Sequence, residues 1–542
     1  MSTIHPVRRR VPRLLTLLAA GLTVAACGVE RDVVAINAAT TPIAPTEPTV
    51  SQPPPPATTE PAPSTSAPPS TSPPPTAPES TLPPILEPQL NVDIPLADVV
   101  NVDPDKPPRD YDAFVAVALT DIQRWWNEQY PAVYGVPFEP LQGGVYAGYP
   151  ERQTDLPGCG DDPTTPYQEL QEFVAFYCEF GDFMVFDDDS VLVLRPLADE
   201  FGPAVMGIVL AHEFGHAIQS RNGGLDQGLP TIITEQQADC FAGAWTGQAY
   251  GGESPLLRLG DRDIRAGLIA MLSVRDPVGT DQFVVGGHGS AFDRVGAFQE
   301  GFVQGPARCA ELLDAPLQLM PNQFQSLVDF ERGGNASYDC TDDPSPDCRP
   351  APEFLAEDLN NYWDTTLDGG FEPITTQPVD GPDLTVCTDA VQLAAEIVVC
   401  PSDRTVVFDE PAVRSLYDEF GDFTIGYFYG IAWAELVQRQ LGRQSTGEVR
   451  ALDRDCLTGA WVRDITPDAQ GNTPRQADTD GDGEPDSTVS SSPGDLDEAI
   501  RMAILEGDNG FNVDQVGSPF EKIAAFRVGV LGGLSACDRD LG

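Results

Sequence analysis

This chain of 542 residues has few basic side chains, few histidines and no long apolar run. It contains 31 Lys and Arg against 83 Asp and Glu, so its formal net charge is −52 at pH 7. A surface this acidic argues against binding to nucleic acid or to anionic lipid, both of which attract basic proteins. The apolar stretch at 14–26 holds about 13 residues, whereas a membrane-spanning helix needs about 20. We therefore expect no nucleic-acid partner and no membrane-spanning helix.

The sequence also lacks any CxxC spacing, which argues against a zinc site built from cysteines. There are 11 cysteines in all. Cys27 follows an apolar stretch that is preceded by four arginines, and this pattern is typical of a bacterial lipoprotein signal. We expect residues 1–26 to be removed and Cys27 to carry lipid, which would anchor the chain to the cell membrane on its extracytoplasmic face. The competing interpretation, an uncleaved membrane helix, is disfavoured by the short apolar stretch.

Cys27 leaves ten other cysteines, an even number that indicates five disulfides in a secreted chain. Residues 27–108 are rich in Pro, Thr, Ser, Ala and Glu, most densely between 40 and 85. This composition cannot bury a core and favours an extended chain. We expect a disordered stalk that holds the folded part away from the membrane; a spacer without any special reach is the alternative.

Two of the four histidines stand four residues apart in the sequence HEFGH, from His212 to His216. On a helix this spacing places both imidazoles on one face, about one turn apart, where they can bind one metal ion. An apolar lead-in and a glycine pair after the motif predict such a helix. Glu235 fits the third ligand of a His₂Glu zinc site, and Glu213 fits the general base that activates water. The alternative is a buried helix whose two histidines contact only protein groups.

The run from His212 to Gln219, HEFGHAIQ, and the run from Glu235 to Trp245, EQQADCFAGAW, resemble the bacterial neutral zinc metallopeptidase family of gluzincin-like proteins. The resemblance covers about residues 109–312. It implies a mainly helical zincin fold with one zinc ion and the hydrolysis of peptide bonds in a protein or peptide substrate.

The resemblance also implies roles for three further side chains. In related zinc peptidases an acidic residue one turn after the third ligand accepts a hydrogen bond from a liganding imidazole, and here Asp239 would accept it from His212. In related gluzincins a His followed six residues later by Arg lies near the site, where the pair supports the oxyanion of the tetrahedral intermediate; His288 and Arg294 have that spacing. The alternative for His288 is an ordinary loop histidine.

The chain contains four pairs of similar segments in the same order. Residues 289–310 match 517–538 at 8 of 22 aligned positions, where about one or two matches would be expected from average composition. Three shorter pairs precede this one, namely 138–140 with 371–373, 199–202 with 418–421, and 239–245 with 455–461. We interpret the pairs as a tandem duplication with a first copy at 109–312, a connector at 313–351 and a second copy at 352–542.

The second copy lacks every proposed ligand and catalytic group. The aligned replacements are Ile431 for His212, Ala432 for Glu213, Glu435 for His216, Ala451 for Glu235 and Val516 for His288. We expect a degenerate, metal-free copy in which Glu435 reaches solvent or pairs with a donor. Its role is either to pack against the first copy or to bind substrate or a cell-envelope partner. The corresponding cysteines predict the pairs Cys159–Cys178, Cys387–Cys400, Cys240–Cys309 and Cys456–Cys537, with Cys340–Cys348 in the connector.

One segment of the second copy has no counterpart in the first. Asp478, Asp480, Asp482 and Asp486 surround a glycine turn, an arrangement that resembles the start of a calcium-binding loop. Position 12 of an EF-hand count is Val489 rather than Glu, so the pattern is incomplete. Bound Ca²⁺ and a solvated acidic loop are the two interpretations.

Together these patterns predict an α+β, mainly α fold: a zincin-like metallopeptidase domain followed by a degenerate tandem copy. The predicted function is an extracytoplasmic, lipid-anchored zinc metallopeptidase. The alternative from another class is a non-catalytic cell-envelope binding or scaffold lipoprotein whose metal is structural.

Overall fold

The computed structural model of the chain describes residues 88–537, except for 190–193, 325, 342, 344, 347, 368–369, 382–386, 469–472, 475–488 and 508–515. Several predictions fall outside the described residues, namely those for the signal at 1–26, for Cys27 and for Asp478, Asp480, Asp482 and Asp486. In the part of the chain that is described, no helix has both the length and the apolar character needed to cross a membrane.

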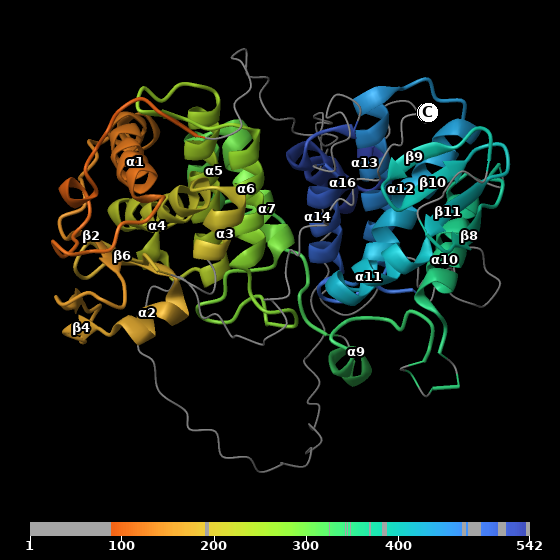
Figure 1. Ribbon diagram of the computed structural model, residues 1–542, viewed down its shortest axis with the longest axis horizontal. Helices are drawn as coiled ribbons and strands as arrows, with labels where there is room; N and C mark the ends of the chain where they lie inside the picture. Colours follow the sequence, from red (N-terminus) through yellow and green to blue (C-terminus); the bar gives the residue numbers. More distant parts are fainter. Residues whose placement is uncertain are drawn as a thin grey trace, which may run out of the picture.

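The described residues form a mixed α/β structure that is mainly helical, which confirms the predicted fold class. Two halves lie side by side along the longest axis of the molecule (Figure 1). The N-terminal half, residues 88–313, contains α1 (Asp112–Tyr134), β2 (Gly144–Gly148), α2 (Tyr167–Phe173), β5 (Ala175–Cys178), β6 (Phe183–Asp187), α3 (Leu194–Phe201), α4 (Ala204–Asn222), α5 (Thr231–Tyr250), α6 (Asp261–Ser273), α7 (Ala291–Gln304) and α8 (Pro306–Ala310).

The C-terminal half, residues 351–537, has the same kinds of element in a similar order. It contains α10 (Ala351–Thr366), β8 (Thr375–Val379), β9 (Val391–Ala394), β10 (Ile397–Cys400), β11 (Thr405–Asp409), α11 (Glu410–Phe420), α12 (Phe423–Gln440), α13 (Gly447–Ile465), α14 (Asp495–Glu506), α16 (Pro519–Gly532) and α17 (Leu534–Cys537). The connector between the halves carries the short helix α9 (Leu327–Glu331).

Each half has a small sheet with the same pairing. In the N-terminal half β6 pairs in parallel with β2 and antiparallel with β5. In the C-terminal half β11 pairs in parallel with β8 and antiparallel with β10, and β9 adds a fourth strand. Helices pack beside both sheets, and most buried apolar residues of the two halves belong to one continuous core, with a small separate cluster in each half.

The start of the described chain differs from the stalk that the composition predicts. β1 (Gln89–Leu90) pairs with β7 (Leu257–Arg258), and Val100 is 2% exposed. The carboxylate of Asp103 is buried and accepts hydrogen bonds from the backbone amides of Gln153 and Thr154. Residues 88–108 are therefore part of the fold rather than of a disordered stalk. A few apolar and hydrogen-bonding side chains among the prolines are enough to attach this segment to the N-terminal half.

Close helix crossings fix the arrangement in both halves. A Cβ atom added at Gly243 of α5 would lie 1.9 Å from the carbonyl oxygen of Phe298 in α7, so only glycine permits this approach. The same contact occurs between Gly459 of α13 and Phe526 of α16, at 2.0 Å. The structure joins the ten described cysteines in the five predicted pairs: Cys159–Cys178, Cys240–Cys309, Cys340–Cys348, Cys387–Cys400 and Cys456–Cys537.

The halves meet where α7 packs against α14 and α16 (Figure 1). The backbone amide of Phe292 donates to Asp497, 3.1 Å away, and Arg275 forms an ion pair with the same carboxylate at 2.9 Å. In return, the buried guanidinium of Arg527 donates to the carbonyl of Phe292 and covers its ring, 4.7 Å from the ring centre. The interface therefore combines ionic and hydrogen-bonded contacts with the packing of a guanidinium on an aromatic ring.

Candidate metal centre

The HEFGH motif lies within α4, as predicted. The helix ends where Gly223 adopts a left-handed φ of 75° and its amide bonds back to the carbonyls of Gln219 and Ser220. Gly215, inside the motif, brings α4 against α5, because a Cβ atom there would lie 2.9 Å from the Cα atom of Ala238. This close crossing carries Glu235, one turn earlier on α5, to the two histidines.

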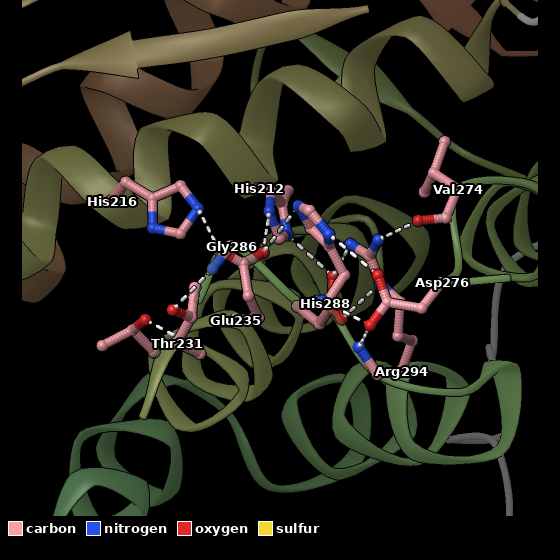
Figure 2. Close-up of polar contacts among 12 residues, drawn as sticks. His212, His216, Thr231, Glu235, Val274, Asp276, Gly286, His288 and Arg294 are labelled. Carbon is pink, nitrogen blue, oxygen red and sulfur yellow. Dashed lines mark hydrogen bonds and ion pairs between the residues drawn. The ribbon is translucent and has the colours of Figure 1, made fainter. Parts of the chain in front are cut away.

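Figure 2 shows His212 and His216 projecting from one helix toward Glu235 on the next. His212 Nε2 lies 3.1 Å from Glu235 Oε2, and His216 Nε2 lies 3.3 Å from Glu235 Oε1. One candidate ligand atom from each of the three residues lies within 4.8 Å of the others. The structure thus brings together the three ligands that the sequence predicts.

Both imidazoles are oriented by hydrogen bonds at Nδ1. His212 Nδ1 lies 2.7 Å from Asp239 Oδ1, which is the contact that the resemblance implied. His216 Nδ1 lies 2.9 Å from the side-chain oxygen of Gln219, whose amide nitrogen donates to the carbonyl of Thr234. Sequence reasoning missed the role of Gln219, although its position three residues after His216 places it on the same helix face. Both Nε2 atoms are consequently left facing Glu235, as metal-binding imidazoles require.

Arg294 lies behind the ligands rather than beside them. Its Nε and Nη2 atoms donate to the two carboxylate oxygens of Asp239 at 2.9 and 2.8 Å, and its Nη1 donates to the carbonyl of Val274. Since three of its nitrogens are used in this way, the predicted role of Arg294 in supporting an oxyanion does not fit the structure. Arg294 instead holds the carboxylate that holds His212.

His288 does approach the group, from the loop that precedes α7 (Figure 2). Its Nε2 lies 3.9 Å from Glu235 Oε2. Asp276 holds it in place by accepting bonds from the backbone amides of His288 and Gly289, both at 2.8 Å, and it lies 3.4 Å from Nδ1. Asp276 is twelve residues away in sequence with no pattern linking it to His288, which explains why sequence reasoning missed it.

The electrostatics of the group favour an anionic carboxylate among imidazoles. Burial alone would raise the pKa of Glu235, but the charges and hydrogen bonds of His216, His288 and His212 hold it well below its ordinary value. Burial also acts to raise the pKa of Asp239, but the charges of Arg294 and His212 have the larger combined effect and lower this pKa. Both carboxylates are therefore ionised in the folded protein at neutral pH.

The whole group is shielded from solvent. Glu213, the predicted base, is 0% exposed, and His212, His216, Glu235 and His288 are 1–3% exposed. The segment just before His288 contacts the start of α5, where the amide of Gly286 donates to the hydroxyl of Thr231. Phe283 in the same segment is 56% exposed. A substrate could reach these buried groups only if the surrounding chain moved.

The corresponding region of the C-terminal half has a different set of polar groups. Glu435 is 0% exposed and accepts bonds from Arg439, Arg450 and Arg454, at 2.6 to 2.9 Å. This confirms the expectation that Glu435 pairs with a donor. Among the described residues, no His, Cys, Asp or Glu group with metal-binding spacing occurs around Glu435.

Two buried polar pairs recur across the halves. Lys522 contacts Asp455 at 3.0 Å, where the N-terminal half has Arg294 with Asp239. The indole nitrogen of Trp461 donates to Asp358 at 2.8 Å, and that of Trp245 donates to Asp121 at 3.0 Å. The supporting framework is thus present in both halves, while the group of His212, His216 and Glu235 occurs in the N-terminal half.

This geometry defines a class of site, in which one carboxylate and two imidazoles lie close enough together that they could hold one metal ion. The chain is 32% identical over 165 residues to an uncharacterized protein of Mycobacterium bovis and, to the same extent, to two of Mycobacterium tuberculosis. The match covers 27% of this chain and 56% of each relative, so the chain spans little more than half the length of the curated relatives it matches. No family model and no solved structure matches the chain.

Proposed function

We propose that the chain is a zinc-dependent peptidase in which His212, His216 and Glu235 hold one zinc ion. The observation that carries the proposal is the convergence of two Nε2 atoms on one carboxylate, with each Nδ1 tethered from behind. Two imidazoles and a carboxylate are a known donor set for catalytic zinc, and such ligands are ordinarily oriented by this kind of outer hydrogen bond. The HEFGH motif and its resemblance to the neutral zinc metallopeptidase family support the same proposal.

When bound, a zinc ion would supply Lewis acidity to a substrate carbonyl and to water. Glu213 would take the proton from the attacking water and pass it to the leaving amine. His288, held by Asp276, would donate a hydrogen bond to the carbonyl oxygen as it becomes negative. Asp239 and Arg294 would keep the imidazole of His212 in its orientation throughout.

A structural metal is the second candidate, and the burial of the site favours it. A catalytic zinc keeps one position open, whereas the ligands here are at most 3% exposed. In the peptidase proposal, the segment 280–287 must open to admit a peptide. The two functions therefore differ in one testable respect: only the peptidase needs Glu213 for turnover.

We further propose that the halves arose by duplication and that the C-terminal half is a copy that has lost the zinc site. The shared order of elements, the shared sheet pairing and the recurring pairs Asp239–Arg294 and Asp455–Lys522 support this. The signal at 1–26 and the lipid at Cys27 belong to the same proposal, in which the chain acts outside the cell at the membrane surface on a protein or peptide.

Metal analysis and peptide hydrolysis on the full chain test the proposal. Wild type should contain one zinc ion and cleave members of a fluorogenic peptide library. Glu213→Gln should keep the zinc while losing about 10²- to 10⁴-fold in turnover, the usual contribution of a general base. A zinc-loaded wild type without peptidase activity would favour the structural metal.

A matched pair of variants tests the ligand assignment separately. His216→Ala should abolish tight zinc binding, because it removes one of three ligands. Glu435→Gln changes the aligned position in the C-terminal half and should leave one zinc per chain. Retention of zinc by His216→Ala would contradict the ligand assignment itself.

A further inference from the structure

A second cluster of carboxylates lies in the C-terminal half, apart from the histidines. Asp422 directly precedes α12, and Asp495 and Glu498 lie in the first turn of α14. One carboxylate oxygen from each lies within 4.8 Å of the others. In the described part of the chain, no Lys, Arg or His side chain forms an ion pair with any of the three. Three acidic groups thus share a small volume without a protein cation to balance them.

In each of the three carboxylates, one oxygen accepts a hydrogen bond from a backbone amide. Asp422 Oδ2 accepts from the amide of Ala336 at 2.9 Å, Asp495 Oδ2 from that of Ser492 at 2.9 Å, and Glu498 Oε2 from that of Phe423 at 2.8 Å. Such bonds fix the direction of a carboxylate while leaving its second oxygen for a ligand.

The second carboxylate oxygen of Asp422 gives the strongest indication of a bound ligand. Asp422 is 7% exposed, and its Oδ1 is buried without a hydrogen-bond partner. Leaving a buried carboxylate oxygen without a partner is unfavourable unless a cation or a proton compensates. Its unused oxygen and its two acidic neighbours, Asp495 and Glu498, together point to a missing positive charge.

The backbone beside the cluster is shaped to admit these carboxylates. Gly421 has a φ of 115°, a left-handed value that favours glycine, and a Cβ atom there would lie 2.1 Å from Glu498 Oε1. Any other residue at this position would push Glu498 away from Asp422. The glycine therefore serves the approach of the carboxylate as well as the turn between α11 and α12.

The pKa shifts agree with a deficit of positive charge. Burial, followed by the charges of neighbouring carboxylates, raises the pKa of Asp495 and Glu498 well above the usual range, and burial raises that of Asp422 as well. Arg501, one turn further along α14, acts in the opposite direction on Glu498 but forms no ion pair with it. Asp329 in the connector adds to the repulsion.

We propose that Asp422, Asp495 and Glu498 bind one hard divalent cation, for which calcium fits best. An all-oxygen donor set selects hard cations, and oxygens about 2.3–2.6 Å from a calcium ion lie within roughly 5 Å of each other, as these do. Backbone carbonyls and water would complete the coordination. The three residues lie outside the acidic segment 478–486 in the sequence, and their proposed role does not depend on the zinc proposal.

The bound cation would link three segments of the chain. Asp422 precedes α12, Asp495 begins α14, and the bond from Ala336 to Asp422 adds the connector. The first turn of α14 also carries Asp497, which binds Phe292 and Arg275 across the interface between the halves. Cation binding at one end of this turn would therefore stabilise the interface at the other.

Thermal unfolding of the full chain, kept saturated with zinc and freed of calcium, tests the site. Wild type should bind calcium here and melt at a higher temperature when millimolar calcium is added. Asp422→Asn/Asp495→Asn should lose this bound ion and the rise in Tm. Without calcium the double variant should be at least as stable as wild type, because it removes like-charge repulsion.

Asp161→Asn/Asp162→Asn is the matched control, since it removes the same charge from two exposed residues of the N-terminal half and should keep the rise in Tm. Calcium bound by wild type should also be counted by equilibrium dialysis, and the Asp422→Asn/Asp495→Asn count should be lower by one. An unchanged wild-type Tm in both calcium and magnesium would overturn the proposal and indicate that the carboxyls share protons instead. A calcium response that persists in Asp422→Asn/Asp495→Asn would overturn it too.

Discussion

Asp239 is the residue on which the orientation of the metal centre depends, because it accepts bonds from both His212 and Arg294. We predict that Asp239→Asn lowers zinc affinity by about 10- to 100-fold, since the amide bears no charge to balance Arg294 or to polarise the imidazole. Competition with a chromophoric chelator measures this. Asp455→Asn removes the corresponding charge beside Lys522 and should leave zinc affinity unchanged; equal losses in the two variants would contradict the prediction.

Glu435 should make the stability of the protein depend on acid pH. Although burial acts upward on its pKa, the charges of Arg454 and Arg450 and the hydrogen bonds of Arg454 and Arg439 hold it below the ordinary value of 4.5. Because the folded pKa is the lower one, the stabilisation is complete above the unfolded pKa and is lost as the pH falls through the folded pKa. We predict that Glu435→Gln costs about 3 kcal/mol at neutral pH, since it leaves the partly buried Arg450 and Arg454 without their anion.

Urea unfolding at neutral pH and at about pH 3 measures the effect, since the carboxyl of wild type is increasingly protonated at the lower pH. The difference between Glu435→Gln and wild type should shrink at the lower pH. A difference that stays constant over this range would show that Glu435 contributes through shape rather than charge.

At the residue scale, the sequence predicted what spacing along one helix determines. His212 and His216 share a face because they are four residues apart, and Asp239 follows Glu235 by one turn. Asp276 was not predictable, since a loop brings it to His288 from twelve residues away. Arg294 was placed correctly near the centre but on the wrong side, because spacing does not report which carboxylate a long side chain will reach.

Helix crossings through glycine are the feature that decides how the elements pack. We predict that Gly243→Ala destabilises the protein by about 3 kcal/mol or more, because a Cβ atom 1.9 Å from a backbone oxygen forces α5 and α7 apart. Gly251→Ala, at the end of α5 with a φ of −64°, is the control and should change stability by less than about 0.5 kcal/mol. Chemical denaturation compares the two. Similar effects would mean that helix propensity, rather than the crossing, sets the cost.

Among the elements, α4 could be predicted with its C-terminal stop because apolar residues, motif and glycines lie on one continuous segment. The short strands could not be predicted. β5 and β6 are four and five residues long and entirely buried, so they lack the alternation of apolar and polar residues that marks a half-exposed strand. The pairing of β1 with β7 joins residues far apart in sequence, and a proline-rich composition conceals it. Local pattern fails wherever an element is fixed only by a distant partner.

For the molecule as a whole, Arg527 should determine whether the halves unfold together. It is buried, bonds to the carbonyl of Phe292 and covers the Phe292 ring. We predict that Arg527→Ala lowers the Tm and replaces one calorimetric transition by two, because the halves lose their central contact. Arg308→Ala removes a partly exposed arginine that pairs with Glu300 within the N-terminal half, and it should keep a single transition. Two transitions already present in wild type would contradict this.

The arrangement of arginines around Glu435 gives every molecule an internal reference. Amide hydrogen exchange in α12 and α13 reports how strongly this helix arrangement is protected when arginines and a carboxylate occupy its centre. Exchange in α4 and α5, followed in the same sample with and without zinc, reports the protection that the ion adds. The effect of the metal on the free energy of local opening could thus be measured as a difference in exchange between two parts of one chain. Both parts experience the same concentration, buffer and folding history.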